Sequence, residues 1–518
     1  MDWGNWTTYW VLSEWAIRLV MLPVIVLRKE RPSTCLAWLT LVFFAPWLGA
    51  ILYLVVGETR LGRKRLQLRK SQWLSLESLN APRVGSRLVT SDNSSFVPLE
   101  PLDEDEDIQQ QSAELERSQT VSHQGLSYQG EELLPSPLRS LANLAVQLTG
   151  FPATPDHEIS YLSDSLLTVD RLIAEIDSAT DHVHLLYYIF RDDVVGRRVA
   201  EALTRARQRG VACRVLVDAV GSRHMLRTLA PAMRRNGIDV RAALPVRIYR
   251  IPFSRIDLRN HRKIAIVDGR VAYVGSQNIV EPRYGHRKAG PWYDVTARIV
   301  GPAVHHLQLL FLEDWFYESG EWLDEPRFFP PISGGGNTIL QILPSGPDLP
   351  TERFQDLLVK AIFLAEREII LTSPYFVPDE PLSLALRLAA LRGINVQLVL
   401  PRRSDHPIVD AASEFHWRRL REFGVHVYFF PDGLLHAKTL TIDNQVALFG
   451  SANYDIRSFH LNFEVNLLIY TPEAVEELRE LQKRYIERSK KASAEDLASP
   501  GWARNLAIHM AKLLSPLL

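Results

Sequence analysis

Two long apolar segments come first in the chain, and alternating helix and strand patterns follow them. Residues 6–27 and 35–57 are each apolar and long enough to cross a bilayer core, which takes about 20 helical residues. The pattern therefore predicts a two-helix transmembrane hairpin, with a re-entrant hairpin as the alternative. Glu14 and Arg18 lie four residues apart in the first segment, so we expect them to pair on one helical face and reduce the cost of burial.

Basic residues beside both segments bear on the orientation in the membrane. The loop at 28–34 holds Arg28, Lys29 and Arg31, whereas RLGRKRLQLRK at 60–70 holds six basic residues. The larger cluster favours a cytoplasmic location for the chain that follows it, and it would attract anionic lipid headgroups. A cleaved signal peptide is not expected, because the first residues are acidic and a second apolar segment follows at once.

The first unit is taken as residues 1–70. After it, the periodic spacing of apolar residues is lost, and it then returns in two successive stretches. Within the connecting segment 71–137, residues from 88 on are rich in Ser, Gln, Asp and Glu, so we expect a largely disordered linker. Helical patterns then alternate with apolar strands, and one order of elements occurs twice. We therefore expect two α/β domains with mixed or largely parallel sheets, at 138–330 and 331–492.

A last amphipathic helix is expected at 493–518. Its apolar stripe consists of Trp502, Leu506, Met510, Leu513 and Leu517. Such a stripe suits a helix at the membrane interface, and it equally suits a helix packed on the catalytic core. The pattern alone leaves both arrangements open.

Composition narrows the classes of function. The chain has 59 basic and 60 acidic residues and a formal net charge of −1. It therefore lacks the basic excess that is usual in a general nucleic-acid binder. Its two cysteines, Cys35 and Cys213, lie far apart in apolar surroundings. We expect both to be small buried apolar residues, with no disulfide or zinc framework.

One polar pattern interrupts an apolar strand in each repeat. NHRKIAIVDG (260–269) and LLHAKTLTID (434–443) each carry a histidine, a lysine two residues later and an aspartate five residues after the lysine. On an extended strand, residues two apart point to the same face. Each motif is followed at equal spacing by GSxN, which adds a hydroxyl and an amide. The residues concerned are His261, Lys263, Asp268, Ser276 and Asn278 in the first repeat, and His436, Lys438, Asp443, Ser451 and Asn453 in the second.

An imidazole, an ammonium and neutral donors on one face suit a tetrahedral oxyanion such as a phosphodiester. Two such sets that face each other put imidazoles on opposite sides of one phosphorus, where one attacks and the other protonates the leaving oxygen. The acidic residue after each motif, Asp294 in WYDV and Glu464 in LNFEV, can hold the other ring nitrogen and select its tautomer. The lysines would repel a cation, and no carboxylate cluster has ligand spacing, so neither a metal nor another cofactor is predicted.

The doubled HxKx4D and GSxN pattern resembles the phospholipase D superfamily. Further stretches resemble its bacterial cardiolipin synthases with two N-terminal spans: YYIFRDD (187–193), RIDLRNHRK (255–263), TSPYFVPDE (372–380), GLLHAK (433–438) and RSFHLNFE (457–464). The resemblance implies two phospholipase D-like domains, packed as a pseudo-two-fold pair around one shared active site and preceded by the transmembrane hairpin. It also implies a multi-pass protein of the bacterial cytoplasmic membrane with cytoplasmic catalytic domains.

The implied reaction is metal-independent transfer of a phosphatidyl group between two phosphatidylglycerol molecules, giving cardiolipin and glycerol through a phosphatidyl-histidine. Its partners are phosphatidylglycerol and anionic membrane lipids, with no nucleic acid; the oligomeric state, a homo-oligomer included, stays open. The resemblance makes His261 the nucleophile and His436 the acid and base, although the symmetry of the motifs alone does not decide their order. The phosphoryl oxygens would be held by Lys263, Lys438, Asn278 and Asn453, supported by Ser276 and Ser451, with Glu464 and Asp294 as orienting acids.

Asp268 and Asp443 complete the two motifs, and we expect them to stabilise the turn after the strand rather than touch substrate. Three other functions remain open. A membrane-anchored phospholipase D that hydrolyses lipids to phosphatidic acid would use the same residues. A phosphodiesterase or nuclease is disfavoured by the two apolar segments and the absence of a basic excess. A catalytically inactive lipid-binding scaffold is disfavoured because both motifs are complete.

Overall fold

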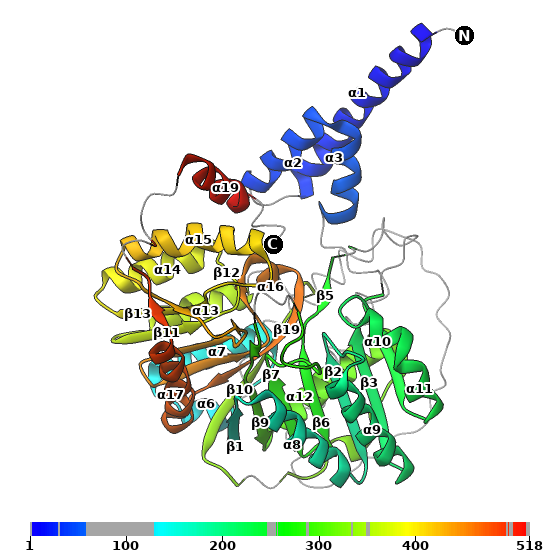
Figure 1. Ribbon diagram of the computed structural model, residues 1–518, viewed down its shortest axis with the longest axis vertical. Coiled ribbons are helices and arrows are strands. Elements are labelled where there is room, and N and C mark those ends of the chain that lie inside the picture. The colour runs from blue at the N-terminus through cyan, green and yellow to red at the C-terminus, as the bar shows by residue number, and fades with distance from the viewer. Residues whose placement is uncertain are drawn as a thin grey trace, which may run out of the picture.

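The computed structural model divides into a small helical unit and a large α/β body (Figure 1). It describes residues 3–28, 32–57, 129–245, 257–285, 290–332, 335–348, 353–493 and 501–513, and the single residues 255 and 496. The basic cluster at 60–70, most of the predicted linker and Leu517 lie outside the described residues.

The helical unit contains one helix of spanning length. Helix α1 (Trp3–Arg28) is continuous, and its Thr8–Arg28 portion is long and apolar enough to cross a membrane. The second predicted span is not one helix: α2 (Pro32–Phe44) ends at a break, and α3 (Pro46–Leu52) and a π-helical turn, η1 (Tyr53–Gly57), follow it. Pro46 cannot extend α2, because it lacks an N–H and its ring clashes with the carbonyl four residues earlier. The second predicted span is therefore not one continuous helix.

The α/β body begins inside the predicted linker. Helices α6 (Gln129–Glu132) and α7 (Ser136–Thr149) are formed there, so residues 129–137 are folded rather than disordered. The elements of the first repeat are β1 (Thr154–Leu162), α8 (Ser165–Ser178), β2 (His182–Tyr187), α9 (Val194–Gln208), β3 (Ala212–Asp218), α10 (Arg223–Thr228), α11 (Ala230–Arg235), β4 (Asp239–Ala243), β5 (Arg259–Asn260), β6 (Lys263–Val267), β7 (Val271–Gly275), β8 (Trp292–Tyr293), β9 (Thr296–Val300) and α12 (Ala303–Ser319).

A 3-10 turn, η4 (Pro326–Phe328), leads into the second repeat. Its elements are β10 (Thr338–Ser345), α13 (Arg353–Phe363), β11 (Glu368–Thr372), β12 (Phe376–Val377), α14 (Glu380–Leu391), β13 (Asn395–Pro401), α15 (Pro407–Glu422), β14 (His426–Phe430), β15 (Leu434–Leu435), β16 (Thr439–Ile442), β17 (Val446–Gly450), β18 (Tyr454–Asp455), α16 (Ile456–His460), β19 (Asn462–Ile469), α17 (Pro472–Arg488), β20 (Lys490–Lys491) and α19 (Trp502–Leu513).

The strands of the two repeats form equivalent mixed sheets that are joined edge to edge. In the first, β2, β3 and β4 are parallel, while β6, β7, β9 and β1 add antiparallel neighbours. In the second, β11, β13 and β14 are parallel, and β16, β17, β19 and β10 follow in antiparallel order. Strands β1 and β10 pair antiparallel with each other and join the sheets. The predicted pair of related α/β halves is confirmed.

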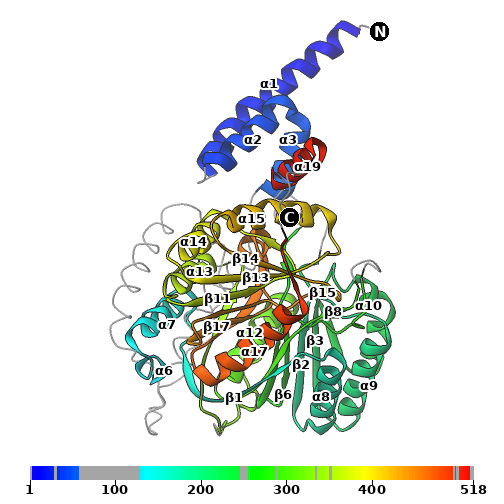
Figure 2. The same cartoon turned by 60° about the vertical axis from the view of Figure 1, so that its left-hand side comes forward.

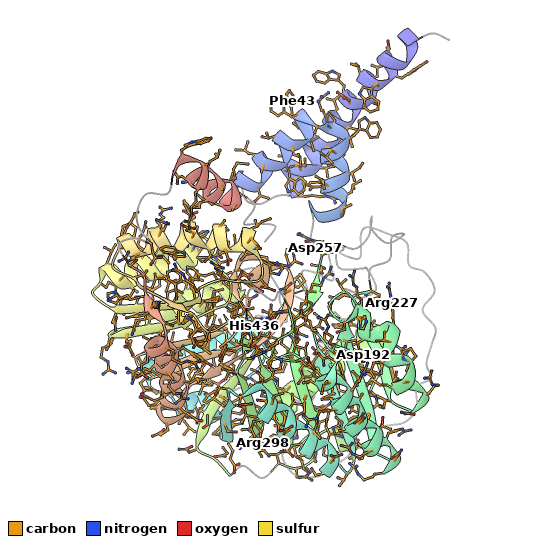
Figure 3. All side chains as sticks on the ribbon, viewed as in Figure 1. Phe43, Asp192, Arg227, Asp257, Arg298 and His436 are labelled. Carbon is orange, nitrogen blue, oxygen red and sulfur yellow. The ribbon has the colours of Figure 1, made fainter. Side chains whose placement is uncertain are left out.

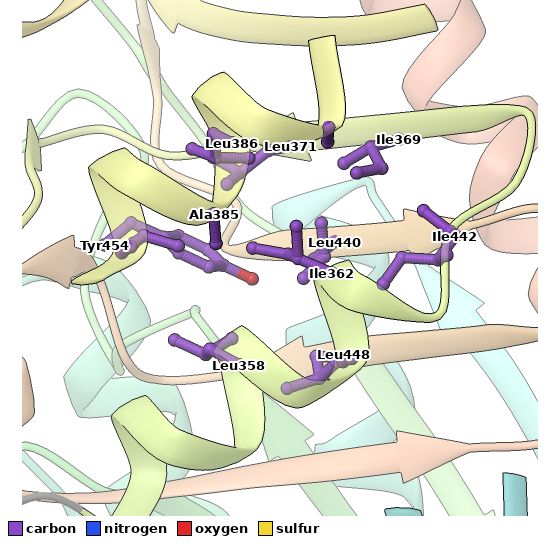
Figure 4. Packing of buried hydrophobic residues seen from close by; sticks show 14 of the residues in the cluster. Leu358, Ile362, Ile369, Leu371, Ala385, Leu386, Leu440, Ile442, Leu448 and Tyr454 are labelled. Carbon is purple, nitrogen blue, oxygen red and sulfur yellow. The ribbon is translucent and has the colours of Figure 1, made fainter. Parts of the chain in front are cut away.

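Helices cover the sheets in layers (Figure 2). Helices α8 and α9 cover one face of the first sheet, and α13 and α14 cover the outer face of the second. Helices α12 and α17 lie in the core that both halves share. Figure 4 shows how Leu358 and Ile362 of α13 meet Leu386 of α14 and Leu440 of β16 in the outer core of the second half. Helix α7, which the sequence assigns to the first domain, packs into that same outer core.

The C-terminal helix α19 packs on α15 through a face that the predicted stripe does not include. Ile508 and Ala511 are buried, and Ala511 contacts Ala412 of α15. The stripe residues Trp502, Leu506 and Met510 remain 82%, 55% and 55% exposed. The helix therefore packs on the body and still presents an apolar face outward.

Candidate active site

The two His-Lys motifs meet between the two halves, each at the start of its strand. His261 lies between β5 and β6, and its N–H donates to the carbonyl of Phe463 in β19 at 2.8 Å. His436 lies between β15 and β16, and its N–H donates to the carbonyl of Tyr293 in β8 at 2.8 Å. Each motif is thus held by a strand of the other half, as the parallel pairs β5–β19 and β15–β8 show. Figure 3 shows His436 near the middle of the body.

The orienting acids are exchanged between the halves. His261 Nδ1 lies 2.9 Å from both Glu464 oxygens, and His436 Nδ1 lies 2.6 Å from Asp294 Oδ1. Glu464 follows His436 in the chain, and Asp294 follows His261, so an assignment of each acid to the motif that precedes it is wrong. The exchange arises because each acid lies on or beside the strand that pairs with the other half's motif.

The serines lie behind the acids. Ser276 Oγ donates to Asp294 Oδ1 at 2.7 Å, and Ser451 Oγ donates to Glu464 Oε2 at 2.6 Å. Each hydroxyl also accepts a backbone N–H, from Val295 just before β9 or from Val465 in β19, and both serines are fully buried. They therefore orient the acids, which is the supporting contact that the structure gives them.

The asparagines of the GSxN turns differ in how the fold uses their side-chain oxygens. Asn278 Oδ1 accepts the N–H of Ile189, which leaves its amide N–H groups to donate elsewhere. The side-chain oxygen of Asn453 is buried and has no hydrogen-bond partner among the described residues. Both turns follow strands, β7 and β17, that pair with the motif strands, as the sequence predicts.

The aspartates of the motifs are used within the fold. Asp268 accepts the backbone N–H groups of Thr180, Asp181 and His182. Asp443 accepts those of Glu366, Arg367 and Glu368 in the equivalent turn. Each aspartate follows the far end of its motif's strand, β6 or β16, whereas the histidine lies before the near end. These contacts agree with the expected role in the turn, and they exclude Asp268 and Asp443 from the reacting groups.

Burial controls the protonation of the histidines. It lowers the pKa of His261 and that of His436 to about 4 each, although Glu464 and Asp294 act in the opposite direction. Burial would raise the pKa of each carboxylate, but the adjoining histidine and its hydrogen bond hold both pKa values below the usual range. At neutral pH the site therefore holds two neutral imidazoles, each oriented by an ionised acid.

Burial also disfavours the charged form of the two lysines. Burial lowers the pKa of Lys263 to about 7, and it lowers that of Lys438 well below its usual value, helped by the nearby Lys263. Each ammonium donates to the carbonyl of its own motif's histidine at 2.6 Å. A phosphodiester between the motifs would supply the missing negative charge and favour the protonated lysines.

Two aromatic residues complete the surroundings of the histidines. The Tyr188 ring meets the ring of His261 edge-on at 4.8 Å, and the Trp292 ring lies 4.4 Å from that of His436. They close one side of each imidazole and limit its access to water. Sequence reasoning missed both, although Tyr188 lies in the YYIFRDD stretch and Trp292 stands two residues before Asp294. The pairing of the two halves positions both histidines, so the sequence alone does not reveal these contacts.

No group of three or more metal-ligating side chains is present in the described part of the chain. The nitrogen atoms at the site already have other partners. Both Nδ1 atoms bind carboxylates, and the ammonium form of each lysine lowers the pKa of the imidazoles beside it.

Comparisons with known proteins identify the family of this chain. A model of the cardiolipin synthase phospholipase D-like domain matches residues 172–288 and 358–486, once in each half, and a phospholipase D-nuclease N-terminal model matches residues 15–58. Cardiolipin synthase A of Serratia proteamaculans (strain 568) is 33% identical over 98% of this chain and 97% of its own length. The chain belongs to the cardiolipin synthase family. Cardiolipin synthase of Listeria welshimeri is also 33% identical, over 95% of each chain.

A solved structure supports the fold of this cardiolipin synthase family member. The crystal structure of phosphatidylserine synthase from Haemophilus influenzae Rd KW20 matches with a TM-score of 0.58 at 15% identity, and covers 74% of this chain and 100% of that chain. The resemblance inferred from the motifs is therefore confirmed for the family and for the duplicated phospholipase D-like fold.

Proposed function

We propose that the chain is a phosphatidyltransferase that makes cardiolipin and glycerol from two molecules of phosphatidylglycerol. The observation that carries the proposal is a pair of buried imidazoles, one from each half, each with a buried carboxylate on Nδ1 and near the lysines of both motifs. Near full-length similarity to cardiolipin synthases supports the same reaction. The chemistry needs no metal, because the lysines and asparagines supply the charge and hydrogen bonds that a phosphoryl group requires.

In the first step, Nε2 of His261 attacks the phosphorus of one phosphatidylglycerol. Glu464 holds Nδ1–H, which leaves Nε2 with its lone pair free. A phosphorus–nitrogen bond forms, the bond from phosphorus to the glycerol oxygen breaks, and His436 gives that oxygen a proton. Binding of the anionic diester raises the pKa of His436, so its proton is available despite the low value in the empty site.

In the second step, the terminal hydroxyl of another phosphatidylglycerol enters where glycerol left. The neutral His436 takes the hydroxyl proton, the new oxygen–phosphorus bond forms and the bond to His261 breaks. The product is cardiolipin, and both histidines return to their starting states. One site therefore serves two lipids in turn through a covalent intermediate.

Transfer rather than hydrolysis requires that water be kept from the intermediate and that lipid reach it. The aromatic contacts of Tyr188 and Trp292 restrict access to the imidazoles. Helix α19, which carries the exposed apolar residues, lies on the same side of the body as the membrane helices, between them and α15, in both views (Figures 1 and 2). This supports a body held at the bilayer surface, in the cytoplasmic membrane of a bacterium, with the catalytic halves on the cytoplasmic side.

The test is purified protein with phosphatidylglycerol in liposomes, with chelator and no added metal. Cardiolipin and glycerol in equal amounts are expected. Phosphatidic acid as the main product would make the chain a hydrolase. His261→Ala and His436→Ala should each abolish turnover, and full activity in either variant would exclude the two-histidine mechanism.

A further inference from the structure

The second apolar segment folds back on itself. A Cβ added to Gly49 would come within 2.7 Å of the Cα of Val42, so the two backbones touch at this point. Seven residues along a straight helix are about 10 Å apart. Helices α2 and α3 therefore lie side by side, as Figure 1 also shows, and glycine is needed where they meet.

Neither arm of this fold can cross a bilayer. Helix α2 has 13 residues, which corresponds to about 20 Å at 1.5 Å per residue. Helix α3 has 7 residues and η1 has 5. A hydrocarbon core is about 30 Å thick. Helix α1, with 21 residues in its apolar portion, is the one element of that length in the described part of the chain.

The turn between the arms is held by the charged pair of α1. A helix that ends inside hydrocarbon leaves carbonyl groups without donors, which is tolerated only where other protein groups satisfy them. Arg18 Nε donates to the carbonyl of Phe43 at the end of α2 at 3.1 Å, while Arg18 Nη2 donates to Glu14 at 3.1 Å. Trp10 Nε1 also donates to Glu14, at 3.0 Å. Glu14 and Arg18 therefore neutralise each other's charge, and Arg18 also binds the turn between the two arms.

Packing places both ends of the fold at one end of α1. The rings of Trp10 and Trp47 lie 6.0 Å apart, so the turn reaches the first half of α1. Tyr53 returns to the other end, where it is buried with Ile25 and meets Trp38 edge-on at 5.2 Å. The chain thus leaves the fold beside the place where it entered.

We propose that residues 32–57 form a re-entrant hairpin, which enters and leaves the bilayer on one side, and that α1 is the crossing helix. Charge supports this arrangement. In a two-span topology, Arg28, Lys29 and Arg31 would lie across the membrane from the six basic residues of 60–70. In the re-entrant topology all of them lie on the side of the catalytic halves, in accord with the tendency of basic residues to stay cytoplasmic. The Trp3 end of α1 then lies on the opposite side.

Cysteine labelling tests the topology. In the full chain with Cys35→Ser and Cys213→Ala, a single cysteine replaces Gly4, Glu30 or Glu58. In a fourth variant, Glu201→Cys at an exposed position of α9 marks the catalytic side. A membrane-impermeant maleimide is applied to right-side-out and inverted vesicles. Labelling in detergent confirms that each cysteine is reactive, and synthase activity confirms that each variant is folded.

Positions 30 and 58 should react from the same side as position 201, and position 4 from the other side. Labelling of positions 30 and 58 from opposite sides would overturn the re-entrant hairpin. Labelling of position 4 from the side of position 201 would overturn the crossing by α1. Neither result depends on which lipid the enzyme makes, so the topology can fail while the proposed function stands.

A distance measurement tests the fold-back directly. Spin labels at Leu36 and Leu54, both exposed, would be about 27 Å apart on one straight helix, whereas packed helices lie about 10 Å apart. A short distance in liposomes is expected, and a distance near the longer value would refute the hairpin. Arg18→Leu should broaden the short distance, whereas Leu19→Ala, which alters an exposed position on the same helix, should leave it unchanged.

Discussion

Each orienting acid binds the histidine of the other half, and this exchange can be tested by replacing each carboxylate with the amide of the same shape and no charge. Glu464→Gln retains the size of a fully buried side chain whose oxygens lie 2.9 Å from Nδ1 of His261. The His261 ring gains positive charge when it bonds to phosphorus. At about 4 Å and an effective dielectric constant of about 20, the carboxylate stabilises that charge by about 4 kcal/mol. A neutral hydrogen bond retains about 1 kcal/mol.

The net loss of about 3 kcal/mol corresponds to roughly a 100- to 200-fold slower step at His261. Asp294→Asn is the matched change at His436. The assay uses a phosphatidyl ester of p-nitrophenol, whose leaving group needs no proton. A variant that impairs only the acid should therefore still release nitrophenolate rapidly in the first turnover, and a variant that impairs the nucleophile should not.

His261→Ala and His436→Ala are measured in the same assay to establish which histidine has which role. Glu464→Gln should then resemble His261→Ala in the step it slows, and Asp294→Asn should resemble His436→Ala and keep the nitrophenolate burst. The resemblance of each acid variant to its histidine variant follows from the contacts whichever histidine is the nucleophile. Retention of the burst by Asp294→Asn follows from the role of His436 as the acid. If Glu464→Gln instead resembled His436→Ala, each acid would serve its own half and the exchanged pairing would be refuted.

Three further predictions concern charge, stability and the membrane. Because burial lowers the pKa of Lys263 to about 7, its ammonium is present below that pH and is lost above it; binding of sulfate, followed by calorimetry, should weaken as pH rises through 7 to 8, and Lys263→Arg should flatten this dependence. Asp443→Ala leaves three backbone N–H groups without their acceptor and should lower the unfolding free energy by about 2–4 kcal/mol in urea melts. Asp443→Asn keeps one acceptor oxygen and should lose less; if the Ala and Asn variants were equally stable, the role of the carboxylate in the turn would be refuted. Leu506→Ser should reduce binding to phosphatidylglycerol vesicles in flotation assays, whereas Asn505→Ser on the same helix should not.

Much of the catalytic chemistry could be predicted from local pattern. The doubled His-Lys spacing, the GSxN turns and the repeated element order indicate two equivalent halves with one shared phosphodiester site, because strand periodicity alone places His261 and Lys263 together. The same reasoning assigned Asp268 and Asp443 to turns, where their carboxylates indeed bind backbone N–H groups.

Other features could not be predicted because they depend on contacts between distant segments. The exchanged acids require β5 to pair with β19 and β15 with β8, across about 200 residues in one case and about 140 in the other. The serines looked equal to the asparagines in the motif, and only the position of the acids shows that Ser276 and Ser451 face away from the ligand.

The membrane unit shows the same division between pattern and packing. Hydropathy measures the length of an apolar run, and residues 35–57 are long enough to span. Their direction is decided by a proline that ends α2, a glycine that lets the arms touch and an arginine that binds the exposed carbonyl. The sequence by itself therefore determined the repeat, the catalytic residue types and the affinity for membranes, since these follow from local spacing and composition. The tertiary structure alone decided which acid serves which histidine and how the second apolar segment runs, since both depend on long-range pairing.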